Sequence, residues 1–366
     1  MDILKPKFDN DAICIAVSSS NEYVPYLSVY LKSIVDNASK KHNYDIIVFE
    51  RDISDNNKKI LQSAFKYENI SLRFVNPTSY FKGTNLYVTH HYFKEECYYR
   101  IVAPVILNKF KKIIFTDLDI IVKDDIFKLT LIDMKQKTIA ACIEPVWNDF
   151  YQNNQNILGY DIRQYTKNIL KLRIPTAYYN TGVIIIDVEK YNLENSFNKI
   201  IELIRNERFL YQEQCALNKY FNNRITQLDK TWNFEVNLPT NIFYKKYKEI
   251  EDIKIIHYLG CGKPWLYLNS ELAEIWWSYA RQTPFYEEIM LRMIQHNTSM
   301  AMQISRNIDL SAVKNALNLG RNKLKYWRYK LLSKITFGKK RKKYKEKRKK
   351  VKTLIKQTKQ FLKGIK

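Results

Sequence analysis

The sequence predicts an α/β protein with a mainly parallel central sheet, followed by a basic helical tail. Three observations carry this prediction. Short β-branched runs alternate with helical stretches along the first 285 residues, positive charge is concentrated beyond residue 300, and 46% of the 366 residues are hydrophobic. The hydrophobic content excludes an intrinsically disordered chain, which could not bury enough apolar surface to fold.

The predicted strands are short, nearly continuous apolar runs, which is typical of strands buried on both faces of a parallel sheet. They comprise residues 11–17 (DAICIAV), 44–49 (YDIIVF), 70–75 (ISLRFV), 112–117 (KIIFTD), 138–143 (TIAACI) and 182–188 (GVIIIDV). Helices are predicted between several of them, at residues 24–39, 54–65 and 96–110. Sheets of this kind bind ligands beyond the carboxyl ends of their strands, so functional residues are expected there.

The charge divides the chain into two regions. The formal net charge is +24, and residues 301–366 hold 23 Lys and Arg against only Asp309 and Glu346, a net charge of +21. Residues 1–300 are nearly neutral. We therefore predict one domain over residues 1–285 and a basic, amphipathic, helical extension over residues 286–366.

The extension contains two predicted apolar helix stripes, with the polybasic run at residues 339–350 expected to connect them. The first stripe comprises Leu324, Trp327, Leu331 and Ile335, and the second comprises Val351, Leu354, Ile355, Thr358, Phe361, Leu362 and Ile365. Clustered Lys and Arg attract anionic lipid, and Trp327, Phe337 and Phe361 could insert at the interface. We predict an anionic membrane surface as the partner of residues 320–366. A nucleic-acid arm and a solvated extension are the alternatives, but no RNA-binding aromatic segment accompanies the basic run.

The cysteines and the N-terminus indicate where the protein works. Five scattered cysteines without a Cys-x-x-Cys spacing argue against a disulfide framework or a zinc knuckle, and favour a reducing compartment. The first residues lack the basic and apolar pattern of a leader, and no apolar run approaches the ~20 residues of a membrane span. The expected location is cytoplasmic, peripheral on the cytoplasmic face of the membrane.

The segment IIFTDLDIIV contains the first candidate metal ligands. Asp117 and Asp119 follow an apolar strand, and residues i and i+2 of an extended chain point to the same side, so both carboxylates could bind one ion. Hard oxygen ligands suit Mg²⁺ or Mn²⁺. Taken alone, an Asp-x-Asp pair is common and is more often a solvated turn at a strand end than a metal site.

A second segment, IKIIHYLGCGKPW, adds further candidates. His257 ends a strand-like run, and an imidazole ligand beside two carboxylates shifts the preference from Mg²⁺ toward Mn²⁺. Gly260 and Gly262 permit close backbone approach, and Lys263 could hold a diphosphate as a point charge. The alternatives are a structural histidine and a surface lysine.

Six segments occur in a characteristic order: IAVSSSNEYVPYLSV, YYRI, DLD, YYNTGVIIIDVEKY, YQEQCALN and HYLGCGKPW. Over roughly residues 11–285 they resemble retaining glycosyltransferase family 8, which includes bacterial lipopolysaccharide galactosyl- and glucosyltransferases and glycogenin. The resemblance implies a single nucleotide-sugar-binding domain of the GT-A type. It also implies a UDP-sugar donor and a Mn²⁺ or Mg²⁺ cofactor.

The resemblance assigns roles to residues of this chain. Contacts to the uridine and the donor fall on Val17, Ser18, Ser20, Asn21, Tyr23 and Arg100. The metal and diphosphate site comprises Asp117, Leu118, Asp119, His257, Gly260 and Lys263. The residues implied around the donor sugar are Asn180, Gly182, Glu213 and Gln214, of which Asn180, Glu213 and Gln214 are the catalytic candidates. Residues 18–20 are all serine, where many members carry an aspartate near the uracil, so the individual base contacts differ.

The stereochemistry of the reaction depends on whether a carboxylate can attack the sugar. Retaining glycoside hydrolases pair a carboxylate nucleophile with a carboxylic acid, but the matching position here is the amide Gln214. Glu213 and Asp187 are nearby in sequence without being obvious nucleophiles. The resemblance therefore implies front-face attack, in which the acceptor enters on the side from which the diphosphate leaves.

The predicted function is metal-dependent, retaining transfer of galactose or glucose from a UDP-sugar to a glycan or glycolipid acceptor. Bacterial lipopolysaccharide, lipooligosaccharide or other surface-glycan synthesis is the expected setting. One alternative is a glycogenin-like glucosyltransferase that acts on protein, and another is a non-catalytic nucleic-acid-binding or scaffold protein that uses the basic tail. The sequence does not distinguish the two epimeric donors.

Overall fold

The computed structural model describes residues 4–8, 12–88, 94–236, 252–260, 262–307 and 310–363. Cys261 and Ile365 lie outside these ranges. The chain forms two compact units, Met1–Met293 and Ile294–Lys366. Each unit is described here by itself.

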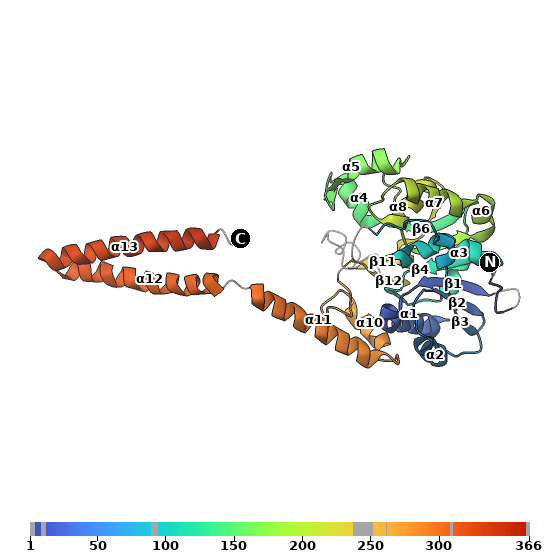
Figure 1. The fold of residues 1–366 in the computed structure, drawn as a ribbon, viewed down its shortest axis with the longest axis horizontal. Coiled ribbons are helices and arrows are strands. Elements are labelled where there is room, and N and C mark those ends of the chain that lie inside the picture. The colour runs from blue at the N-terminus through green and yellow to red at the C-terminus, as the bar shows by residue number, and fades with distance from the viewer. Residues whose placement is uncertain are drawn as a thin grey trace. The chain divides into compact units, whose positions relative to one another are not determined.

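The first unit is built on a seven-stranded sheet with the order β10-β6-β9-β4-β1-β2-β3 (Figure 1). Its strands are β1 (Ile13–Ser18), β2 (Tyr44–Phe49), β3 (Ile70–Val75), β4 (Lys112–Thr116), β6 (Ile139–Ile143), β9 (Tyr179–Asp187) and β10 (Ile225–Gln227). Neighbouring strands are parallel except that β9 runs antiparallel to both β4 and β6. The prediction of an α/β fold with a mainly parallel sheet is confirmed.

The apolar runs in the sequence coincide with these strands because both faces of the sheet are covered. Strands β2 and β3 have the predicted bounds, and every residue of β2 is buried. Strand β9 begins at Tyr179, three residues before the predicted start, because Tyr179 and Asn180 continue the pairing with β6 past a bulge. This polar start of β9 belongs to the candidate site described below.

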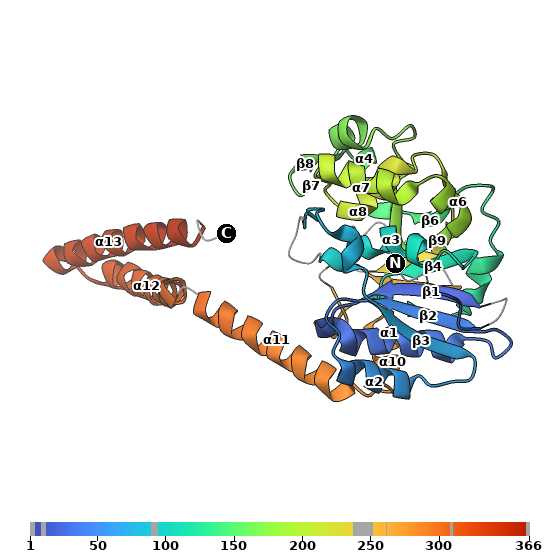
Figure 2. The ribbon, with the colours of Figure 1, turned by 45° about the vertical axis from the view of Figure 1, so that its right-hand side comes forward.

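Helices cover the sheet on both sides (Figures 1 and 2). One face packs against α1 (Val24–Asn37), α2 (Asp55–Ala64) and α10 (Ala273–Ala280). On the other side lie α3 (Tyr99–Ile106), α4 (Pro145–Gln152), α5 (Ile162–Tyr165), α6 (Val188–Leu193), α7 (Ser196–Asn206) and α8 (Gln212–Tyr220). A separate hydrophobic core fills each side. The loops at the carboxyl ends of the strands are thereby held on a rigid frame.

Two small sheets complete the first unit. The first has the order β11-β12-β5 and comprises β5 (Ile120–Val122), β11 (Phe234–Val236) and β12 (Ile255–Tyr258). It continues from the end of β4 and holds His257 beside the Asp-x-Asp segment. The second is the hairpin of β7 (Asn156–Ile157) and β8 (Tyr160–Asp161) between α4 and α5.

The boundary between the units falls inside α11 (Tyr286–Asn307). Ile289 and Met293 are buried in the core that contains α1 and α10, so the first two turns of α11 belong to the first unit. The predicted boundary at residue 285 marks the start of this helix. The burial of Ile289 and Met293 moves the end of the compact unit to Met293.

The second unit contains a helical hairpin of α12 (Leu310–Ile335) and α13 (Gly338–Lys363). The polybasic run at residues 339–350, which we expected to join the two apolar stripes, forms the first half of α13. Lys, Arg and Glu are good helix formers, and the reversal takes place at Gly338, whose φ of +59° favours glycine. The rings of Tyr329 and Tyr344 stack between the two helices, with centroids 6.2 Å apart.

The hairpin leaves part of its apolar surface exposed. Leu324, Trp327 and Leu331 follow one side of α12 at helical spacing, and Trp327 keeps 61% of its surface exposed. Leu354 on α13 and Phe337 at the reversal are exposed as well. Within the described residues, no helix combines the length and apolar character that a bilayer-crossing segment requires.

The cysteines of the first unit are free thiols where the structure describes them, namely Cys14, Cys97, Cys142 and Cys215. Burial raises the pKa of all four, which disfavours the reactive thiolate. Cys14, Cys142 and Cys215 are small side chains of the two hydrophobic cores.

Candidate active site

The pairing of strands brings distant segments of the sequence to one edge of the sheet. The register of β1 with β4 places Ser18 next to Asp117, and the N–H of Asp117 donates to the carbonyl of Gly182 at 2.7 Å. Beyond β4, the N–H of Tyr258 donates to the carbonyl of Asp119 at 3.0 Å. Four of the six characteristic segments therefore meet at the carboxyl end of β4. They are IAVSSSNEYVPYLSV, DLD, YYNTGVIIIDVEKY and HYLGCGKPW.

Asp117, Asp119 and His257 form a compact cluster of potential metal ligands, with ligand atoms that all lie within 4.8 Å of one another. The Nε2 atom of His257 is 3.2 Å from Oδ1 of Asp119 and 3.8 Å from Oδ2 of Asp117. His257 is 1% exposed, whereas the two carboxylates are partly open to solvent. A ligand could thus reach the cluster from the side of the carboxylates.

The hydrogen bonds around His257 determine which ring nitrogen faces the carboxylates. The N–H of Gly182 donates to Oδ1 of Asn180 at 2.7 Å, and Nδ2 of Asn233 donates to the same oxygen at 2.9 Å. Oδ1 of Asn233 is consequently the acceptor that lies 2.9 Å from Nδ1 of His257. Because the backbone N–H is a fixed donor, the chain of bonds places a hydrogen on Nδ1, so that the neutral imidazole has its lone pair on Nε2.

This arrangement fits a metal ion. The lone pair of Nε2 faces carboxylate oxygens, which repel it, and neither His257 Nε2 nor Asp119 Oδ1 has a hydrogen-bond partner although both are buried. A divalent cation between the three residues would remove that repulsion. The bond from Nδ1 to Asn233 is the outer-shell support that metal-binding histidines usually have. One imidazole and two carboxylates suit Mn²⁺, with Mg²⁺ and other divalent ions also possible on the donor set.

Gly182 is required by the close packing of this cluster. A Cβ atom at this position would lie 2.3 Å from Cε1 and 2.8 Å from Nδ1 of His257, and 2.9 Å from Oδ1 of Asn180. Any side chain would displace the imidazole or break the hydrogen bond that orients it. The glycine in the segment YYNTGVIII is therefore explained by the position of a residue 75 places later.

Two cations flank the carboxylates. Lys263 forms an ion pair with Asp119 and donates to the carbonyl of Tyr258 at 2.5 Å. Burial alone would raise the pKa of Asp119, but the charge of the Lys263 ammonium group outweighs this effect and holds the pKa well below its usual range. Asp119 is consequently a carboxylate at every physiological pH.

Arg100 is a buried residue that contacts Asp117. Its guanidinium forms an ion pair with Asp117, donates to the carbonyl of Thr181 and lies 3.5 Å from Glu213. Burial would lower the pKa of Arg100, but Asp117 and Glu213 raise it further above its usual value. In this structure Arg100 positions the candidate metal ligand Asp117 through this ion pair, and its contact with the donor stays a prediction.

Gln214 and Glu213 begin α8 and lie next to the polar start of β9. The side-chain amide of Gln214 is fixed by its neighbours. Its Oε1 accepts from the N–H of Thr181 at 3.0 Å, and its Nε2 donates to the hydroxyl of Tyr178 at 3.2 Å. Glu213 is buried, and burial, partly offset by Arg100, raises its pKa to about 7. Asn180, Gly182, Glu213 and Gln214 are therefore neighbours in one wall of the site.

Asp187 lies at the opposite edge of the sheet. It pairs with Lys112 at the first residue of β4, whereas Asp117 follows the last. Five residues of extended strand separate these positions, about 16 Å. Oδ1 of Asp187 caps α6 by accepting from the N–H of Lys190. Asp187 has a structural role and cannot reach a sugar bound near Asp117.

The loop after β1 supplies the predicted uridine contacts. Val17 is buried within β1, and the hydroxyls of Ser18 and Ser20 are buried without hydrogen-bond partners. Unpaired buried hydroxyls are costly, and a bound polar ligand would satisfy them. Asn21 has a different task, because its Oδ1 accepts from the N–H of Ser54 and from Asn57 and so fixes the loop to α2.

Three further predicted positions lie around this edge. Tyr23 packs edge-on against Tyr26, and Lys94 lies over its ring at 4.9 Å. Leu118 packs against the core, which turns the flanking carboxylates outward. Gly260 has a φ of +63°, a conformation that favours glycine, in the turn between His257 and Lys263.

Several residues that shape the site have no recognisable signal in the sequence. Asn233 orients His257, and Thr181 binds both Arg100 and Gln214 through its backbone. Glu144 and Glu235 form a buried carboxyl pair nearby, and burial raises the pKa of Glu144 to about 7 and that of Glu235 further above its usual value. Asn233 and Glu235 occur in the unremarkable run KTWNFEV. Only their place beside β12 reveals their role.

The comparison with known families fits this geometry. Residues 14–269 match the profile described as Glycosyl transferase family 8, which covers well over half of the chain. The chain belongs to glycosyl transferase family 8. The predicted family resemblance is thus confirmed, and the family 8 domain contains every candidate ligand described above.

Individual family 8 relatives are distant from this chain. Glycosyltransferase GlyF of Streptococcus pneumoniae is 26% identical over 72% of this chain and 60% of its own length. General stress protein A of Bacillus subtilis is 27% identical over 70% of this chain and 88% of its own. Lipopolysaccharide 1,3-galactosyltransferase of Salmonella typhimurium is 24% identical, with 46% of this chain and 48% of its own covered.

Solved structures of glycosyltransferases have the same fold. The bifunctional glycosyltransferase WbbM superposes with a TM-score of 0.70 at 26% identity over 80% of this chain, which spans 53% of WbbM. The galactosyltransferase LgtC, solved with donor and acceptor sugar analogues, gives a TM-score of 0.57 at 20% identity over 74% of this chain and 96% of its own. The architecture is thus of the GT-A type, as predicted.

Proposed function

We propose that this protein is a metal-dependent, retaining hexosyltransferase that moves galactose or glucose from a UDP-sugar to a glycan or glycolipid acceptor. The observation that carries the proposal is the cluster of Asp117, Asp119 and His257, whose imidazole lone pair is aimed at two carboxylates. Family 8 membership favours this interpretation over a non-catalytic scaffold. Bacterial lipopolysaccharide, lipooligosaccharide or another surface glycan is the proposed product.

The proposed donor site extends from the loop after β1 to the loop after β12. The unpaired hydroxyls of Ser18 and Ser20 would form hydrogen bonds with the uridine. They follow Val17, which pairs with Thr116 directly before Asp117. A divalent ion, Mn²⁺ in our proposal, would neutralise the diphosphate as it leaves. Lys263 would exchange its ion pair with Asp119 for a contact to the diphosphate, because the metal would then satisfy that carboxylate.

The wall of the site supports attack from the front face. Gln214 is an amide held by Thr181 and Tyr178, and it is not a nucleophile. Glu213 lies against Arg100, and Asp187 is at the far edge of the sheet. The acceptor hydroxyl would therefore attack C1 from the side of the departing diphosphate and pass its proton to a phosphate oxygen. Mass-spectrometric detection of a sugar bound covalently to Glu213 would contradict this step.

UDP release tests the donor proposal directly. The full-length protein is incubated with UDP-galactose or UDP-glucose and Mn²⁺, and UDP is quantified with a coupled assay. We expect slow release that Asp117→Asn reduces at least about 100-fold, because the metal contributes several kcal/mol to departure of the diphosphate. Glu68→Gln, the same loss of charge at an exposed residue remote from the site, is the control. Equal release by wild type and Asp117→Asn would refute the proposal.

The hairpin of α12 and α13 is the proposed membrane-binding element, which would place the enzyme on the cytoplasmic face of an anionic membrane. The supporting observation is that Leu324, Trp327 and Leu331 stay exposed among basic residues instead of packing inside the hairpin. Exposed apolar side chains beside Lys and Arg suit the interface of an anionic bilayer. A truncation after residue 300 should lose binding to phosphatidylglycerol vesicles. Undiminished binding by the truncated chain would rule this element out.

A further inference from the structure

The first two turns of α11 contact the loop that follows β1. Arg292, on the second of these turns, donates through Nη1 to the backbone carbonyl of Glu22. Its Nη2 forms an ion pair with Glu288, one turn earlier on the same helix. The loop that Arg292 contacts also carries the unpaired hydroxyls of Ser18 and Ser20, which the proposed function assigns to the uridine. A residue of α11 is therefore in direct contact with a proposed donor loop.

Arg292 also contacts Tyr26, the third residue of α1. The Cζ atom of the guanidinium lies over the Tyr26 ring, 5.9 Å from its centroid. Burial raises the pKa of Tyr26, and Arg292 partly offsets this effect because a nearby positive charge favours the phenolate. One guanidinium therefore bridges the backbone of the short helix η1 (Asn21–Tyr23) and the first turn of α1.

Tyr26 connects this contact to the loop after β12. Its ring stacks on Trp265, with centroids 4.4 Å apart and an angle of 18° between the ring planes. The Nζ atom of Lys263 lies 5.8 Å from the centroid of the Trp265 ring, and Lys263 forms the ion pair with Asp119 described above. The series of contacts from α11 to the candidate metal site comprises Arg292, Tyr26, Trp265 and Lys263.

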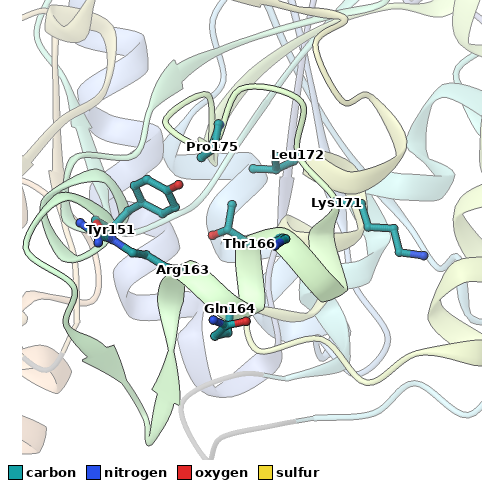
Figure 3. Close-up of a pocket in the computed structure, with 8 residues that line it drawn as sticks. Tyr151, Arg163, Gln164, Thr166, Lys171, Leu172 and Pro175 are labelled. Carbon is teal, nitrogen blue, oxygen red and sulfur yellow. Dashed lines mark hydrogen bonds between the residues drawn. The ribbon is translucent and has the colours of Figure 1, made fainter.

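Converging contacts distinguish Arg292 from other cationic side chains of the first unit. Figure 3 shows a hollow of about 400 Å³ whose lining includes Arg163, Lys167 and Lys171. The charged ends of Arg163 and Lys171 point away from each other there, so they do not converge on one ligand. The contacts of Arg292, in contrast, meet at the two loops that the proposed function assigns to the donor.

Arg292 lies outside the segment that matches the family. The family 8 profile covers residues 14–269, and α11 begins at Tyr286. Ile289 and Met293 are nonetheless buried in the core that contains α1 and α10, so these turns are held by apolar as well as polar contacts. The contact of α11 with the donor loops is therefore a feature of this chain that the family match does not supply.

We propose that Arg292 is a positioning residue that holds the loop after β1 in the conformation that binds the donor. Through the stack of Tyr26 on Trp265, it also fixes the loop that carries Lys263. The inference rests on the proposed function for the identity of the donor, a UDP-sugar. A loop that is already held in its bound conformation binds its ligand at a smaller cost in conformational entropy. Removal of the guanidinium should therefore weaken donor binding and leave the chemical step and the metal ligands unchanged.

Donor binding and turnover by the full-length chain test this role. Arg292→Met keeps an unbranched side chain of good helix propensity and removes the guanidinium. We expect the KM for the UDP-sugar, and the Kd for UDP with Mn²⁺ measured by calorimetry, to rise about tenfold. The kcat for UDP release should change less than about twofold. The affinity for Mn²⁺ alone, measured by electron paramagnetic resonance, should stay at the wild-type value.

Three further variants separate positioning from a role in stability alone. Glu288→Gln removes the ion-pair partner of Arg292 on α11 and leaves the contact with Glu22, so it should keep the wild-type KM. Arg281→Met removes an exposed arginine at the end of α10 and should keep it as well. Arg292→Lys retains a donor for the carbonyl of Glu22 and should recover most of the lost affinity.

The outcomes distinguish this inference from the proposed function. A wild-type KM and Kd in Arg292→Met would overturn the inference and leave the proposed function intact. The inference also fails if Arg292→Met lowers kcat at an unchanged KM, or if Glu288→Gln raises the KM as much as Arg292→Met does. If the wild type binds UDP but releases none from a UDP-sugar, the proposed function is refuted, and the Kd for UDP still decides the role of Arg292. A wild type that binds no UDP would refute both.

Discussion

Replacing Asn233 with leucine should weaken Mn²⁺ binding without touching a ligand. The side chain of Asn233 accepts the hydrogen of His257 Nδ1 at 2.9 Å and donates to Asn180 at 2.9 Å. Leucine has a similar size but no polar atoms, so the imidazole can rotate or change its tautomer. Loss of such a support costs 10- to 100-fold in metal affinity, which corresponds to about 1.4–2.7 kcal/mol.

The measurement is a titration of full-length protein with Mn²⁺, in which electron paramagnetic resonance quantifies the free ion. Asn233→Asp retains an acceptor for His257 and should keep most of the affinity. Asn192→Leu is the matched control, because its amide donates to the carbonyls of Pro104 and Val188 away from the site. Urea unfolding of each variant separates loss of stability, expected at about 1–3 kcal/mol for a buried unpaired group, from loss of binding. Wild-type affinity in Asn233→Leu would refute the proposed orientation of His257.

Four further predictions follow from contacts in the structure. Gly182→Ala places a Cβ 2.3 Å from His257 Cε1, so UDP release should fall about 100-fold while circular dichroism stays native; unchanged release would show that the imidazole is not held there. His257→Ala should raise the Mn²⁺ concentration needed for half-maximal release about as much as Asp119→Asn does, and an unaltered Mn²⁺ dependence would exclude it as a ligand. Burial raises the pKa of Glu144 from 4.5 to about 7. Between pH 4.5 and about pH 7, this carboxyl group is therefore protonated in the folded chain and ionised in the unfolded chain. The free energy of unfolding should therefore fall by up to about 3 kcal/mol as the pH rises from about 4.5 to 7. Urea unfolding should show a smaller fall for Glu144→Gln, and the same pH dependence in both proteins would contradict this prediction. Replacing Leu324, Trp327 and Leu331 with serine should reduce partition to phosphatidylglycerol vesicles at least about tenfold, with helicity retained. Unchanged partition would mean that the basic residues alone cause membrane binding.

The family and the candidate metal ligands could be recognised because their signals are local in sequence. The strand before Asp117 is a continuous apolar run, and Asp117 and Asp119 are two residues apart, which suffices to place both carboxylates on one side. The segment IKIIHYLGCGKPW then added His257, at the end of a strand-like run, as the third candidate, and the structure brings it within 3.2 Å of Asp119. The charge of the last 66 residues and their helical periodicity likewise indicated a basic helical extension.

Other features depend on contacts between residues far apart in the sequence, which no local pattern contains. The role of Asn233 depends on the pairing of β11 with β12, and the elimination of Asp187 as a nucleophile depends on the direction of β9. The polybasic run was predicted only to join the two apolar stripes, and the structure places it within α13, where its helix propensity and the packing of α12 on α13 support the helix.

The sequence by itself determined the fold class, the family and the chemical type of the metal ligands, because strand burial and ligand spacing are properties of short segments. Only the tertiary structure decided which nitrogen of His257 faces the carboxylates, why residue 182 is glycine, and that Arg292 contacts the loop after β1. Hydrogen-bond direction and close packing depend on which groups meet in space. They become visible only after the chain has folded.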